Sequence, residues 1–178
     1  MTAADELGVR MQNAKDTFYE VLRDRVAARN AALTVVVRGV VRPAILVDEN
    51  EIVSAAELRD CFRLRWTSLQ RDAEGSAPLV AMQCEIRYAT AGTADAGGLD
   101  RGRALESMDA LLATAVGTAP QSAVKKNFST LASGGVATEL NSRVWWSDVA
   151  FGALAEDEAE MRRIATVEVW SYQEVGEA

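Results

Sequence analysis

The sequence has 178 residues, of which 49% are hydrophobic and 25% are charged, so it is long enough to bury a core and has a globular composition. Its formal net charge of −7 excludes the overall basic surface of a typical nucleic-acid-binding protein, while leaving room for a local basic patch. The sequence contains no histidine, so the side chain most used for acid–base catalysis near neutral pH is missing.

The first 30 residues predict a long amphipathic helix over residues 5–29. Its apolar residues recur at steps of three and four: Leu7, Met11, Ala14, Phe18, Val21, Leu22 and Val26. Because only one stripe of this helix is apolar, we expect it to pack on another element rather than to stand alone.

The next segments predict strands. Residues 33–41 are rich in valine, and Gly39 inside this run suggests a bulge or bend, before a second short strand at 44–47. Residues 61–69 and 79–90 alternate apolar with polar side chains. Such alternation indicates that each of these strands has one buried face.

A small-residue loop leads to a second helix over residues 101–116, with Asp100 as its cap. The glycine-rich run from Gly92 to Gly102 could in principle bind a phosphate at the helix start. It lacks the Gly-Lys-Ser/Thr of a P-loop, and Asp100 would repel an anion, so a flexible turn is the favoured interpretation.

The segment 118–141 is rich in small and polar residues and predicts a long irregular insertion. Its charged and large side chains include Lys125, Lys126 and Phe128. A loop of roughly 20 residues inside a compact domain is unusual and tends to be functional or to lack order when unbound.

The chain closes with two strand-like runs, 144–151 and 164–172, joined by the acidic connector 156–160. If they pair as a regular hairpin, Trp145 lies on the core face with Val149 and Phe151. The opposite face then carries Trp146, Trp170 and Tyr172. An exposed aromatic group of this kind marks a contact surface. Coverage of that face by the 118–141 segment is an equally good interpretation.

Three other groups have simple structural interpretations. Arg63, Arg65 and Arg87 share one strand face, either as a solvent-facing row bridged by Glu85 or as a surface for an acidic partner. The acidic runs around Asp48 and at 156–160 lack the ligand spacing of a calcium loop and fit solvated turns. The two cysteines, at positions 61 and 84, fit buried reduced thiols.

These observations predict a single α+β domain over residues 1–178, with an antiparallel or mixed sheet and both main helices on one sheet face. The core residues expected under the helices are Leu64, Trp66, Met82, Ile86, Val167 and Val169. No apolar run reaches the roughly 20 residues of a membrane span, and the N-terminus lacks a secretory signal, so we expect a cytoplasmic protein. We expect no catalytic residues, no metal and no cofactor.

The order of elements resembles that of the phage tail terminator, or tail-completion, proteins and their relatives in contractile tail-like systems. The similarity is carried by residues 78–88, residues 105–112 and the closing strand that ends at Tyr172. The resemblance implies a homohexameric ring that caps the tail tube and joins it to the neck. The implied partners are other copies of the chain and the tail-tube and neck proteins, with DNA only passing through the ring lumen and no membrane. It also implies a cytoplasmic protein during assembly that ends in a virion or tail-like particle.

We expect the subunit interface of such a ring to use Trp146, Trp170, Tyr172, Lys125, Lys126 and Phe128. The segments 48–60 and 118–141 depart from the family pattern and leave a tube, neck or other adaptor position open. Two other classes remain: a protein-binding adaptor that is a monomer or dimer, and a small-ligand-binding enzyme, which the missing histidine disfavours. A hexameric mass favours the terminator, a dimer the adaptor, and a monomer with a deep polar pocket the enzyme.

Overall fold

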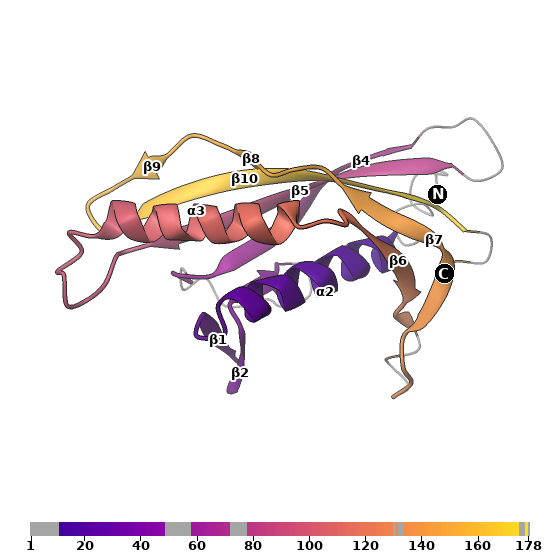
Figure 1. The fold of residues 1–178 in the computed structure, drawn as a ribbon, viewed down its shortest axis with the longest axis horizontal. Coiled ribbons are helices and arrows are strands. Elements are labelled where there is room, and N and C mark those ends of the chain that lie inside the picture. Colours follow the sequence, from indigo (N-terminus) through magenta and orange to yellow (C-terminus); the bar gives the residue numbers. More distant parts are fainter. Residues whose placement is uncertain are drawn as a thin grey trace, which may run out of the picture.

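The computed structural model describes residues 11–48, 58–71, 78–129, 131, 134–174 and 177. These residues form an α+β fold in which two helices pack on one face of an eight-stranded sheet, beside a separate two-stranded ribbon (Figure 1). The elements in chain order are α2 (Gln12–Arg29), β1 (Thr34–Val37), β2 (Val40–Pro43), β3 (Ile45–Val47), β4 (Phe62–Arg71), β5 (Leu79–Thr90), α3 (Arg101–Gly117), β6 (Ser122–Asn127), β7 (Thr138–Trp146), β8 (Ala150–Phe151), β9 (Ala155–Glu156) and β10 (Met161–Tyr172).

The predicted fold class is confirmed. The main sheet has the strand order β3-β4-β5-β10-β7-β6, with β8 and β9 pairing with β10. It is mixed because β3 runs parallel to β4, whereas the other pairs are antiparallel. The central strands β5 and β10 pair along their whole length, from Leu79 opposite Tyr172 to Thr90 opposite Met161.

Both helices bury their predicted apolar stripes in one core. From α2 these residues include Phe18, Leu22 and Val26, and from α3 they include Leu105 and Leu112. The residues expected beneath the helices are in the same cluster: Leu64, Met82, Ile86, Val167 and Val169 are buried, and Trp66 is half-buried against them. The predicted helix residues 5–10 lie outside the described residues.

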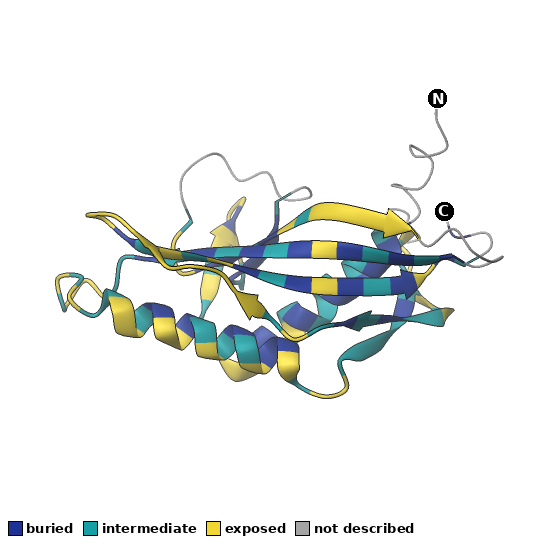
Figure 2. Ribbon diagram, turned by 90° about the horizontal axis from the view of Figure 1, so that it is seen from above, coloured by how far each residue is buried: buried dark blue, intermediate teal, exposed yellow. Residues whose placement is uncertain are grey.

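On the other face of the sheet, called the outer face below, neither of the two described helices lies in front of the strands (Figure 2). Along β5 and β10 the side chains alternate between the core and this face, so buried and more exposed residues follow one another. The helix-covered face therefore builds the core, and the outer face is available for contacts.

Residues 33–41 are a hairpin rather than one bent strand. Arg38 and Gly39 both have positive φ, +50° and +79°, as a two-residue hairpin turn requires, and Val37 pairs directly with Val40. The sequence did not predict this turn within the valine-rich run, because Arg-Gly is a weaker turn signal than Asn-Gly. The ribbon is fixed from one side only, where Val37 packs with Ala44, Leu46 and Cys61.

The segment 118–141 is more regular than predicted. Residues 122–127 form β6, and β7 begins at Thr138, so strand pairing is absent only before Ser122 and between the two strands, where these parts are described. Helix α2 holds β6 in place: the Lys126 N–H donates to Thr17 Oγ1 at 3.0 Å, and the Phe128 N–H donates to Asn13 Oδ1 at 3.0 Å. These partners lie over 100 residues away, so local composition does not reveal them.

The closing hairpin contains a bulge that shifts the predicted alternation. Trp146 pairs with Val169, and Phe151 pairs with Ala165. The chain therefore advances five residues from Trp146 to Phe151 but only four along β10, which leaves one extra residue on the β7–β8 side. The extra residue lies between Trp146 and Ala150, where the Ser147 N–H donates to Glu168 O at 2.9 Å. The prediction that Trp145 faces the core and Trp146 faces outward is therefore wrong, and the two residues exchange faces.

Candidate functional site

Trp146 was predicted at a subunit interface, but the structure places it in the core. Its side chain is 4% exposed, and its indole N–H donates to Val116 O at 3.0 Å. The ring meets Phe18 edge-on at 5.5 Å between centroids, and the Arg25 guanidinium lies 5.3 Å from the ring centroid. Trp146 is therefore a packing residue between α2, α3 and β7.

Trp145 occupies the position on the outer face that was predicted for Trp146. It pairs with Trp170 across β7 and β10, and its ring meets Tyr172 at 6.1 Å and 88° between planes. Trp145 and Trp170 are half-buried and Tyr172 is exposed. The sequence predicted three aromatic residues on this face of the sheet. The face of Trp170 and Tyr172 is confirmed, whereas the third residue is Trp145 and not Trp146.

The predicted lysine pair is bound to its own chain. Lys125 is 0% exposed, and its Nζ donates to Glu177 Oε2 at 2.6 Å and to Tyr172 O at 2.7 Å. Lys126 reaches Glu20 on α2 at 2.6 Å, and Phe128 is half-buried beside α2. A register shift between Val124 and Lys126 turns Lys125 inward, so a surface role for Lys125 is wrong.

The arginine row lies on the outer face as predicted. Arg63 and Arg87 stand directly opposite each other, an arrangement that repels unless each charge is neutralised. Asp48 binds Arg63 at 2.9 Å, and Glu85 binds Arg87 at 2.8 Å. Glu85 therefore neutralises Arg87 on its own strand, and although Arg65 lies opposite Glu85 in the strand register, no ion pair joins these two side chains in the described structure.

A pocket of about 570 Å³ opens on the outer face beside the segment 150–160, which we call the arm. The arm contains β8, β9 and the acidic turn into β10. The pocket is lined by Leu58, Ala89, Gly152, Ala153, Ala155 and Ile164, together with Arg63, Arg87, Tyr88, Glu160, Arg162 and Arg163. Leu154 on the arm and Ile164 next to it are exposed by 46% and 44%. The arm region is therefore an exposed apolar surface with a charged rim.

A second exposed apolar surface is the β1–β2 ribbon. Three of its valines, Val36, Val40 and Val41, are between 58% and 65% exposed. Val36 and Val41 form a directly opposed pair, so they share the face of the ribbon that the core does not cover. The ribbon projects below the helices in Figure 1, whereas β8 and β9 lie at the top of the view, along β10. The two apolar surfaces thus lie on opposite sides of the molecule.

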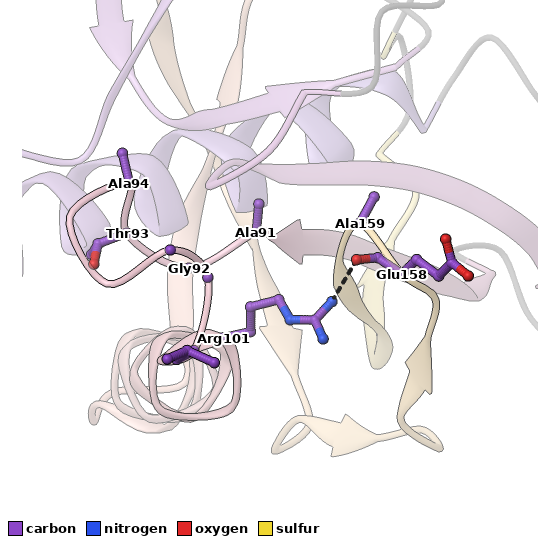
Figure 3. Close-up of a pocket in the computed structure, with 10 residues that line it drawn as sticks. Ala91, Gly92, Thr93, Ala94, Arg101, Glu158 and Ala159 are labelled. Carbon is purple, nitrogen blue, oxygen red and sulfur yellow. Dashed lines mark hydrogen bonds between the residues drawn. The ribbon is translucent and has the colours of Figure 1, made fainter.

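The glycine-rich loop before α3 closes on itself. The Asp100 carboxylate accepts hydrogen bonds from the Thr93 N–H and hydroxyl, both at 2.8 Å, and these bonds lower the Asp100 pKa. The pocket of about 400 Å³ at this loop is bordered by Arg101, whose guanidinium donates to the backbone carbonyls of Asp157 and Glu158 (Figure 3). With its one arginine bound to carbonyls and a carboxylate at the helix start, the loop suits a turn better than a phosphate site.

A polar cluster lies under α3, on the core side of the sheet. The Tyr88 hydroxyl donates to Asp109, and burial together with this bond raises the Tyr88 pKa. Arg163 Nε lies 3.1 Å from Asp109 Oδ1, an ion pair whose N–H is not aligned for a hydrogen bond, and Arg163 also donates to Gly152 O at 2.8 Å. The cluster links α3, β5, β10 and the arm, which is a structural role.

Cys61 and Cys84 are buried thiols, as predicted. Within the described residues, no group of three or more Cys, Asp or Glu side chains is placed to hold a metal ion. No helix in that part of the chain is long and apolar enough to cross a membrane.

Comparison of the sequence with known proteins does not assign the chain to a family. No protein-family model matches the sequence, and no curated protein matches it. The interpretation of function therefore rests on the two exposed apolar surfaces and the aromatic outer face.

Proposed function

We propose that this chain is a structural subunit that assembles with copies of itself into a ring. In line with the family resemblance, the ring is a homohexamer that caps a tail tube and connects it to the neck, and DNA passes only through its lumen. The proposal gives the chain no catalytic step, cofactor or membrane contact. Its partners are further copies of the chain and the tail-tube and neck proteins.

One observation carries this proposal: large apolar side chains are exposed on two unlike surfaces on opposite sides of the subunit. These surfaces are the β1–β2 ribbon, with Val36 and Val41, and the arm region, with Leu154 and Ile164. A closed ring needs a heterologous interface, in which one patch meets a different patch on the neighbour. Two such patches on opposite sides provide that geometry, whereas a two-fold dimer needs only one self-complementary patch.

Native mass spectrometry of the purified chain, followed by negative-stain imaging with tail-tube protein present, tests the proposal. We expect six-subunit species and rings at the ends of tubes. A chain that stays monomeric over the whole accessible concentration range, and that leaves tube length unchanged, would contradict both the ring and its position.

A protein-binding adaptor is the second candidate. The aromatic trio Trp145, Trp170 and Tyr172 on the open outer face supports it, because aromatic residues are enriched where proteins bind one another. A dimeric mass in the same experiment, without rings, would favour the adaptor.

A further inference from the structure

The two exposed apolar surfaces also carry opposite charge. Residues 25–47, which include the β1–β2 ribbon, contain Arg25, Arg29, Arg38 and Arg42 and no acidic residue, a formal charge of +4. Residues 144–161, which include the arm, contain five acidic residues and no lysine or arginine, a formal charge of −5. Because each region carries charge of one sign and the two signs are opposite, this separation points to a contact between the two regions.

The charges at the tips of these regions are not used within the subunit. Arg38 occupies the exposed ribbon turn, and Glu156 and Glu158 are exposed on the arm. None of the three side chains makes an ion pair with any residue that the structure describes. In Figure 3 the Glu158 carboxylate points away from Arg101. The Arg101 guanidinium contacts Glu158 through its backbone carbonyl and not through its carboxylate.

The arginines around the arm pocket do not oppose an incoming arginine. Each already has a carboxylate partner in the chain: Arg63 with Asp48, Arg87 with Glu85, Arg162 with Asp157, and Arg163 with Asp109. Glu160 is likewise paired with Arg59 at 3.0 Å. The charges left over at the arm are therefore the negative ones of Glu156 and Glu158.

We propose that the β1–β2 ribbon of one copy docks on the arm of the next copy, with Val36 and Val41 against Leu154 and Ile164, and with Arg38 facing Glu156 and Glu158. This inference rests on the proposed self-assembly and names the contact that produces it. Burial of the apolar side chains stabilises the contact. The opposite charges make the ribbon bind the arm rather than a second ribbon, because opposite charges attract and like charges repel. The contact repeats head to tail, so each copy uses its ribbon once and its arm once.

Charge reversal tests this pairing. Arg38→Glu places a negative side chain at the ribbon turn opposite Glu156 and Glu158, and Glu156→Arg with Glu158→Arg places two positive side chains on the arm opposite Arg38. Because like charges then meet, each variant should raise the dissociation constant of the subunit contact by at least about tenfold. Sedimentation velocity over a concentration series measures this, and circular dichroism checks that each variant is folded.

Two further samples distinguish a specific loss of the charge pairing from a general loss of the ability to assemble. An equimolar mixture of the two variants should assemble again, in strict alternation, because every mixed contact joins opposite charges. A single chain with all three reversals should also assemble alone. Arg103→Glu, on the exposed face of α3, is the matched control and should assemble like the native chain.

The outcomes distinguish the two proposals. If the native chain assembles and the reversed variants assemble equally well, or if neither the mixture nor the triple variant recovers, the ribbon–arm contact is wrong while the ring stands. If the native chain does not assemble at any concentration or with tube protein, the ring itself is wrong.

Discussion

Trp145 and Trp146 are neighbours in sequence with different surroundings. Trp146→Ala would leave a cavity between α2, α3 and β7 and should cost about 3–5 kcal/mol of unfolding free energy. Trp145→Ala would mainly remove the ring contact with Tyr172 and should cost about 1 kcal/mol. Urea denaturation of the monomer measures both values. Equal losses would contradict the assignment of the two rings to opposite faces.

Lys125 and Lys126 are a second pair of neighbours with unequal surroundings. Glu177→Ala leaves the Lys125 ammonium buried without its carboxylate and should cost roughly 3–5 kcal/mol. Glu20→Ala removes the partner of Lys126, whose ion pair is partly exposed, and should cost about 1 kcal/mol or less. Denaturant unfolding compares the two. A negligible effect of Glu177→Ala would show that the end of the chain does not hold Lys125.

Among the elements, the loop before α3 has a glycine, Gly92, packed directly against the carboxylate that closes the loop. A Cβ at Gly92 would lie 2.4 Å from Asp100 Oδ1, and the residue has φ +75°, whereas Gly97 has φ +60° and nothing within 4 Å of its Cβ position. Both alanine variants should cost about 1–2 kcal/mol for the left-handed backbone. Only Gly92→Ala should also displace Asp100 and shift the Thr93 amide resonance in an NMR spectrum, with Gly97→Ala as its matched control.

The same loop has a defined response to pH. The Thr93 hydrogen bonds lower the pKa of Asp100 in the folded chain, so their stabilisation is fully present above the ordinary aspartate pKa of about 3.9. It is lost as the pH falls through the lowered, folded-state pKa. The loop should therefore stay closed from neutral pH to about pH 4 and open only in stronger acid. An NMR titration of the Thr93 amide measures this, and Asp100→Asn should abolish the transition.

For the whole molecule, the proposed ribbon–arm contact predicts that assembly depends on salt concentration. The Debye length falls from about 10 Å at 0.1 M to about 3 Å at 1 M ionic strength, which screens Arg38 from the acidic arm. Assembly should weaken over this range without disappearing, because burial of the valine pair is not screened. Light scattering across a salt series measures the change. Stronger assembly at high salt would mean that burial alone drives the contact and that the charges oppose it.

The sequence predicts those parts of the fold that depend on local periodicity. The stripes of α2 and α3 and the alternation of β4 and β5 identify the core side correctly, because these signals lie within single elements. The face of Trp146, the burial of Lys125 and the Arg38-Gly39 turn were not predictable in this way. The first two depend on how one segment pairs with another, since a bulge or register shift of one residue reverses every side chain beyond it. The turn was missed for a local reason, because Arg-Gly is a weak hairpin signal.

The bulge after Trp146 belongs to one register of β7 against β10, in which Trp146 lies opposite Val169. Sliding β7 by one residue would replace one tryptophan with the other in the core, so the aromatic rings themselves favour neither register strongly. The residues beside them decide: the observed register buries Val144, and the alternative would bring Arg143 into that position. Burying an unpaired guanidinium is costly, so Arg143 excludes the wrong conformer by being unable to enter the core. A half-buried arginine thereby selects which aromatic ring lies on the outer face of the sheet.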